Sequence, residues 1–124
     1  MRKIVLFIMT FSILSAYDFG KIPEIRAKDI TFGKPMMIMV GKTNCVWCES
    51  MAPQLKEIKE EYPNTIIYYM NSDKEPMWAI KHHILELPVQ IFYNSRGEEI
   101  GRHTGYINKN DILELLKKSG VLRR

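Results

Sequence analysis

Cysteine is scarce in this chain of 124 residues, which contains only Cys45 and Cys48. Structural disulfides usually link distant segments, and neither cysteine has a distant partner within the chain. A bridge between the two would close a very small loop, which restrains little of the unfolded chain and adds little stability. The shortage of cysteine therefore excludes a disulfide scaffold and indicates that the pair serves chemistry.

The chain also lacks long apolar runs and a basic face rich in aromatics. The apolar stretch Ile4–Leu14 is well short of the ~20 residues that a membrane-spanning helix needs. The formal net charge is +4, but no segment interleaves basic residues with aromatics, so we predict no nucleic-acid partner. Repeats, low-complexity tracts and linkers are absent as well, and 124 residues suffice for one domain with a real core.

The first residues have the pattern of a secretory signal peptide. A basic start is followed by the short apolar stretch and then by the small residues Ser15 and Ala16. We therefore predict a signal peptide over residues 1–16, cleaved after Ala16, and one folded domain over residues 17–124. Leu14 is unfavourable at the third position before the cleaved bond, so the sequence does not determine the exact cleavage site. An uncleaved anchor and a first core strand are the alternatives.

Helical and strand patterns alternate along the rest of the chain. The wholly apolar run Met36–Val40 is typical of a central strand that is buried on both faces. The predicted elements are a helix begun near Pro23, a strand over 36–40, a helix over 49–61, a strand over 65–70, a helix over 76–84, strands over 89–93 and 98–104, and a helix over 109–119, capped by Asn108 and ended by Gly120.

The junctions between these elements define the expected sheet. Thr43 and Asn44 can cap the second helix, and Pro53 should kink it. Residues 94–97 form the turn of an antiparallel hairpin. The two inner β-α-β connections require a parallel strand pair. The sequence therefore predicts an α/β fold, with a central mixed sheet of about four strands flanked by helices.

Cys45 and Cys48 stand between a predicted strand and a predicted helix. Zinc sites use the same C-x-x-C spacing, but the chain has no further cysteine pair, and the arrangement indicates a redox dithiol. Glu49 stands where a c-type haem motif requires histidine. His82 and His83 are adjacent, without a metal-binding spacing, and we assign no metal ligands. A metallochaperone that binds copper or zinc through the two cysteines remains the alternative.

The order of elements, with Cys45-Val-Trp-Cys48 at the start of the second helix, resembles the thioredoxin fold over about residues 22–120. Pro53, eight residues after Cys45, matches the helix-kinking proline of that family. Leu87 and Pro88, just before a strand, match its cis-proline, which faces the dithiol. The resemblance implies a thiol–disulfide oxidoreductase whose redox group is the Cys45–Cys48 disulfide, with no other cofactor.

The sequence departs from the cytoplasmic thioredoxins at three places. Asn44 replaces a tryptophan, Val46-Trp47 replaces Gly-Pro, and Met39 replaces a buried acid, which leaves the proton acceptor for Cys48 unassigned. The chain is more similar to exported bacterial members. This resemblance implies a periplasmic, monomeric reductant of protein disulfides with a membrane electron donor. The identity of residues 46 and 47 does not determine whether the dithiol donates or accepts electrons, so an oxidant or an isomerase remains an alternative to a reductant.

The expected chemistry assigns different roles to the two cysteines. Cys45 should lie exposed at a helix N-terminus, where backbone N–H groups lower a thiol's pKa. Lys42 would add to this effect, and Glu49 would oppose it. We expect Cys45 to be the nucleophile and Cys48 to be the resolving thiol.

Substrate contacts are expected beside the dithiol. A cis bond at Pro88 would turn the backbone of Leu87 toward it, where that backbone can pair with an extended substrate strand. Trp47 either offers substrates a hydrophobic contact or packs against the neighbouring loop.

Overall fold

A computed structural model describes Phe19 and residues 22–123. The predicted signal peptide, residues 1–16, lies outside this part of the chain. Within it, no helix has the length and apolar character that crossing a membrane requires. The elements are a 3-10 turn (Ala27–Asp29), β1 (Met36–Gly41), α1 (Val46–Glu49), α2 (Ala52–Glu61), β2 (Ile67–Asn71), α3 (Pro76–Lys81), β3 (Val89–Tyr93), β4 (Glu99–Thr104) and α4 (Lys109–Ser119).

The four strands form one mixed sheet in the order β2-β1-β3-β4. β1 and β2 are parallel, whereas β1–β3 and β3–β4 are antiparallel. The predicted mixed sheet of about four strands flanked by helices is therefore confirmed. Only the first β-α-β connection joins parallel neighbours, because the second brings β3 to the far side of β1 and reverses it.

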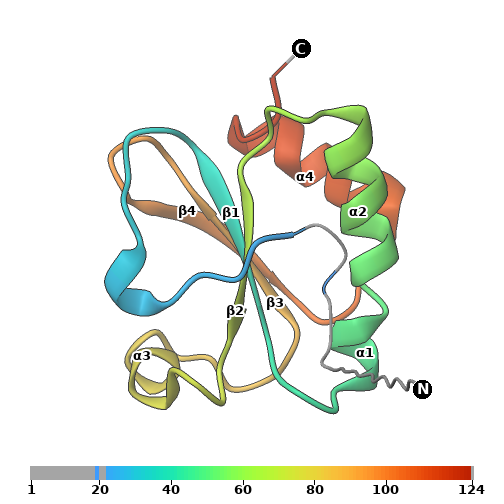
Figure 1. Cartoon of the computed structure of the whole chain (residues 1–124). Helices are drawn as coiled ribbons and strands as arrows, with labels where there is room; N and C mark the ends of the chain where they lie inside the picture. The colour runs from blue at the N-terminus through green and yellow to red at the C-terminus, as the bar shows by residue number, and fades with distance from the viewer. Residues whose placement is uncertain (1–18, 20–21, 124) are drawn as a thin grey trace, which may run out of the picture.

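Helices cover both faces of the sheet. Figure 1 shows α2 and α4 on one face and α3 on the other. Because side chains alternate along a strand, Met37 and Met39 of β1 pack into the α2–α4 side, and Ile38 and Val40 pack into the α3 side, which Trp78 also contacts. The whole of β1 is buried, as its apolar run predicts.

The prediction of a helix near Pro23 is wrong. The chain there runs extended beside β2, where Tyr69 N–H donates to Pro23 O at 2.9 Å and Ile25 N–H donates to Tyr69 O at 2.8 Å. Glu24 and Tyr69 form a parallel bridge, and only Ala27–Asp29 makes a helical turn. The edge of β2 offers unpaired backbone groups, and the segment satisfies them.

The second predicted helix is broken in two, at Ser50 and Met51, between α1 and α2. Pro53 has no N–H to donate to the Glu49 carbonyl, so the helical ladder cannot pass through it. At the break, Met51 N–H bonds to Cys48 O, which is three residues back rather than the four of a regular α-helix. The interruption that Pro53 predicts is confirmed, and it makes a separate short helix that begins next to Cys45.

The third helix is shorter than predicted and ends at Lys81 rather than Ile84. His83 has a left-handed backbone, with φ of 58°, which terminates the helix. The end closes with a bond from Ile84 N–H to Ala79 O at 2.9 Å.

The C-terminal part follows the sequence prediction. Asn94 N–H bonds to Glu98 O across the hairpin turn. The Asn108 side chain accepts from Asp111 N–H at the start of α4, and Gly120, with φ of 84°, ends that helix. The predictions of this turn, this cap and this helix end rest on local signals, and the structure confirms them.

Candidate redox site

Cys45 and Cys48 are joined by a disulfide, with their Cα atoms 5.2 Å apart. β1 ends at Gly41, and the following loop delivers Cys45 to the start of α1. Cys48, one turn into the helix, is completely buried, whereas Cys45 is only partly buried. The sequence prediction of one accessible and one enclosed sulfur agrees with this arrangement.

Cys45 itself caps α1. Its Sγ accepts a hydrogen bond from Cys48 N–H at 3.2 Å. The predicted caps, Thr43 and Asn44, do not fill this role. Thr43 Oγ1 instead accepts from the Asn71 side chain at 3.2 Å, and Asn44 adopts a left-handed backbone with φ of 62° that turns the chain into the helix.

The loop after β2 supports the loop that leads to Cys45. Ser72 N–H donates to Gly41 O at 2.7 Å, and Asn71 Oδ1 accepts from Asp73 N–H at 2.9 Å. Asn71 is almost fully buried, and it ties the two loops together through Thr43. Sequence reasoning missed Asn71. The available signal was a polar residue at the end of an apolar strand, next to the loop that leads to Cys45.

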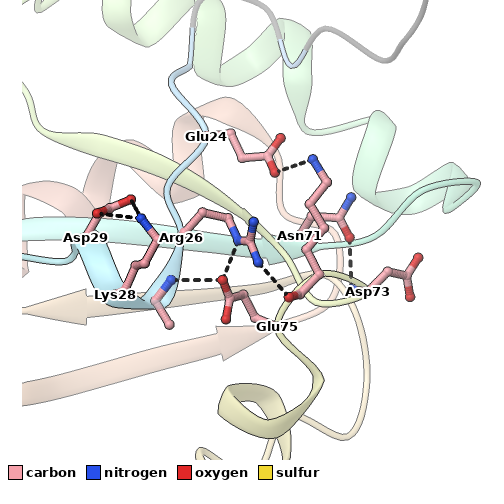
Figure 2. Close-up of polar contacts among 9 residues, drawn as sticks. Glu24, Arg26, Lys28, Asp29, Asn71, Asp73 and Glu75 are labelled. Atoms are coloured by element: carbon pink, nitrogen blue, oxygen red, sulfur yellow. Dashed lines mark hydrogen bonds and ion pairs between the residues drawn. The ribbon is translucent and has the colours of Figure 1, made fainter.

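Charged residues fasten the extended lead-in segment to the same loop (Figure 2). Arg26 pairs with Glu75 and donates to Lys74 O, while Ala27 N–H also donates to Glu75. Lys74 reaches Glu24 at 2.9 Å. The hydrogen bond from Arg26 holds the pKa of the Glu75 carboxyl below its usual range. These ion pairs therefore hold the lead-in segment against the loop after β2.

The floor of the site brings Gly41, Tyr69 and Cys48 together. A Cβ atom added at Gly41 would lie 3.0 Å from Tyr69 Cε1 and 3.1 Å from Cys48 Sγ. The Tyr69 ring stacks on Phe19, with centroids 4.4 Å apart. Burial raises the pKa of the Tyr69 phenol to about 12. Its hydroxyl thus remains protonated at neutral pH.

A buried amide lies where Met39 replaces the acid of cytoplasmic thioredoxins. Gln90, fully buried on β3, donates to Gly105 O at 3.2 Å and contacts Met39 Sδ at 3.8 Å. Its Oε1 lies 2.8 Å from His103 Nδ1, which must carry a proton there because an amide oxygen only accepts. Sequence reasoning missed Gln90, although it is the one polar residue in an otherwise apolar strand.

Leu87 and Pro88 lie at the same end of the sheet as the dithiol. Val40 pairs with Val89, so the residues after β1 and before β3 meet at one edge. The Leu87–Pro88 peptide bond is cis, and Pro88 O accepts from Gly105 N–H. Leu87 and Cys45 pack against the same core cluster.

Trp47 projects from α1 with 61% of its surface exposed. Its ring lies 5.7 Å from that of Tyr106, centroid to centroid, at an angle of 54°. Both readings of Trp47 thus have a basis, because it packs against the β4–α4 loop and still offers a large apolar surface.

The remaining predicted residues lie at the surface. Lys42 and Glu49 are exposed, and their influence on Cys45 stays a prediction. His82 stacks on Trp78, with centroids 4.0 Å apart, and its Nδ1 faces the Trp78 carbonyl. Over Phe19 and residues 22–123, no three His, Cys, Asp or Glu side chains gather as a metal site would require.

Residues 30–120 match the family described as a thioredoxin-like domain. The chain belongs to the thioredoxin-like family. Together with the Cys45–Cys48 pair, membership of this family supports thiol–disulfide oxidoreductase chemistry in general.

Two relatives differ in how much of their length is matched. The M-type chloroplastic thioredoxin of Spinacia oleracea is 27% identical over 85 residues, which cover 68% of this chain and 46% of that protein. The SPbeta prophage-derived thioredoxin-like protein YosR of Bacillus subtilis is 26% identical over 82 residues, which cover 66% of this chain and 95% of that protein. The chain thus spans less than half of the spinach protein but nearly all of the Bacillus one.

The thioredoxin-like fold extends to solved structures at low sequence identity. Mitochondrial thioredoxin 3 of Saccharomyces cerevisiae, in its oxidised form, superposes with a TM-score of 0.67 and 20% identity over 81% of this chain and 97% of that one. This likeness concerns the fold alone.

Proposed function

We propose that the protein is an exported thiol–disulfide oxidoreductase that reduces disulfides of other proteins in the periplasm. The observation that carries the proposal is the asymmetric pair, with Cys45 partly exposed at the cap of α1 and Cys48 enclosed behind it. The first sulfur can meet a large substrate, whereas the second can meet only Cys45. This asymmetry suits an exchange reaction in two steps.

In the first step, the Cys45 thiolate attacks one sulfur of a substrate disulfide. A mixed disulfide forms, and the other substrate sulfur leaves as a thiolate. The Cys48 thiolate then attacks Cys45 Sγ, which restores the Cys45–Cys48 disulfide and releases the second substrate thiolate. Two electrons pass to the substrate, and solvent protonates the leaving thiolates.

Residues around Cys45 supply the conditions for this exchange. Cys48 N–H, which donates to Cys45 Sγ at 3.2 Å, would stabilise a thiolate there. We assign substrate contacts to the exposed ring of Trp47 and to the backbone of Leu87 beside Pro88. A membrane electron donor would return two electrons to the disulfide after each turnover.

Variant trapping tests the assignment of the two cysteines. Cys48→Ser should accumulate covalent complexes with protein substrates, because the mixed disulfide can no longer be resolved, and reducing agent should release them. Cys45→Ser should trap nothing and should lose insulin reduction. Trapping by neither variant, with insulin reduction retained, would refute the proposal.

The direction of electron flow needs a separate measurement. Dithiols of this class span about 150 mV, and equilibration with glutathione places Cys45–Cys48 on that scale. A potential near the oxidising end, about −120 mV, would overturn the reductant role. Stoichiometric copper or zinc on the reduced protein, without insulin reduction, would support a metallochaperone instead.

Localisation is tested on the full chain expressed in a bacterium. We expect the protein in the periplasmic fraction, with a mass that corresponds to loss of residues 1–16. A full-length product in the cytoplasm would contradict both export and cleavage.

A further inference from the structure

Gly41 approaches the buried cysteine more closely than a larger residue permits. A Cβ atom at this position would lie 3.1 Å from both Cβ and Sγ of Cys48, and 3.0 Å from Tyr69 Cε1. None of these three nearest atoms belongs to Cys45. Ordinary van der Waals contact begins near 3.4 Å, so a methyl group at Gly41 would press on both Cys48 and the Tyr69 ring.

The two sulfurs differ in how they are held. Cys45 Sγ accepts the hydrogen bond from Cys48 N–H at 3.2 Å, which keeps it over the start of α1. Cys48 has no exposed surface and lies in the core cluster that includes Tyr69. When the disulfide is reduced, the sulfurs must separate, because two non-bonded atoms need more room than two bonded ones. The empty side-chain position of Gly41 adjoins the enclosed sulfur.

We propose that Gly41 is a positioning residue for the redox reaction: its missing side chain leaves the space into which Cys48 Sγ moves when the disulfide opens. The inference rests on the proposed function, because it concerns the same disulfide. A methyl group at this position fills the space and presses Cys48 Sγ toward Cys45. The free Cys48 thiol is then disfavoured relative to the disulfide.

The test compares Gly41→Ala with Gly101→Ala. Both glycines lie in strands without a left-handed backbone, so both substitutions restrict the unfolded chain alike, but a Cβ at Gly101 meets nothing within 4 Å. The folded proteins are equilibrated with glutathione. Two glutathione thiols give two electrons and two protons to the disulfide and become glutathione disulfide.

We expect Gly41→Ala to shift the equilibrium toward the disulfide by about tenfold, which is a potential ~30 mV more negative. Gly101→Ala should match the parent. An unchanged potential for Gly41→Ala, or one that is more positive, overturns the inference. A parent protein whose disulfide cannot be reduced and reformed by glutathione refutes the proposed function instead, so the two failures are distinguishable.

Unfolding measurements separate this role from simple destabilisation. Gly41→Ala should lower the stability of the reduced protein more than that of the oxidised protein, whereas an equal loss in both forms contradicts the proposal. Should the variant fail to fold, Gly41→Ala is made together with Cys48→Ala, which removes the sulfur. Recovery of the fold in the double variant supports the contact with the sulfur. If the double variant also fails to fold while Cys48→Ala alone folds, the methyl group clashes chiefly with Tyr69 or the Cβ of residue 48, and this overturns the proposal.

Discussion

The side-chain amide of Asn71 donates a 3.2 Å hydrogen bond to Thr43 Oγ1, so the end of β2 holds the loop that leads to Cys45. The same side chain accepts from Asp73 N–H, which fixes the start of the β2–α3 loop. Asn71 is almost fully buried but Thr43 is exposed, so both bonds are partly shielded from water. The position of the cysteine therefore depends on a residue 26 positions away from it in the chain.

Asn71→Ala should weaken both loops. We expect the free energy of unfolding to fall by about 1–3 kcal/mol, because two partly buried hydrogen bonds are lost. We also expect insulin reduction to slow several-fold, because Thr43 lies two residues before Cys45. Thr43→Val is the matched control, since it removes only the bond between the loops and should lose less stability. Unchanged stability in Asn71→Ala would contradict the interpretation.

Trp47→Ala should affect large substrates more than small ones. The side chain is 61% exposed, so we expect little change in stability. The KM for a protein disulfide should rise several-fold, whereas the rate with glutathione disulfide should remain near that of the parent. Met77→Ala, which truncates another apolar side chain that is 73% exposed, is the control and should change neither value. Equal losses on both substrates would show that Trp47 does not act through substrate contact.

Gln90→Leu should destabilise the sheet beside the site. The substitution introduces an apolar side chain of similar size and leaves Gly105 O and the His103 ring without their partner. Unsatisfied buried groups cost about 1–3 kcal/mol, and chemical denaturation should reveal a loss of this size. His103→Phe removes only one of the two contacts, so its loss should be smaller. A Gln90→Leu variant as stable as the parent would show that the amide network contributes no net stability.

Glu75→Gln should reveal a pH-dependent contribution to stability. The pKa of Glu75 is lowered in the folded protein, chiefly by the hydrogen bond from Arg26. The folded state therefore favours the ionised carboxylate, and this stabilisation is present above the unfolded pKa. It is lost as the pH falls through the lowered folded pKa.

The melting temperature of Glu75→Gln should consequently lie below that of the parent at pH 7, and the two should converge in acid. Glu114→Gln is the control, because Glu114 is an exposed residue of α4. A difference that persists unchanged at low pH would show that ionisation of Glu75 is not its source.

The order of elements and the place of the dithiol follow from the sequence because their signals are local. The apolar run Met36–Val40 specifies a buried strand, Asn108 and Gly120 mark the limits of α4, and Pro53 interrupts the helix after Cys48. Each signal acts through neighbours a few residues away, so it can be interpreted without knowing the rest of the fold.

Contacts between distant segments are decided only by the tertiary structure. The segment at Pro23 gives up its expected helix because β2, more than 40 positions later, presents an unpaired edge. Thr43 gives up its expected cap because Asn71 binds its hydroxyl, and Cys45 takes that place. The approach of Gly41 to Cys48 also depends on how β1 and α1 pack. The sequence by itself thus identified the cysteine pair that forms the disulfide, whereas the packing of distant residues decided its surroundings.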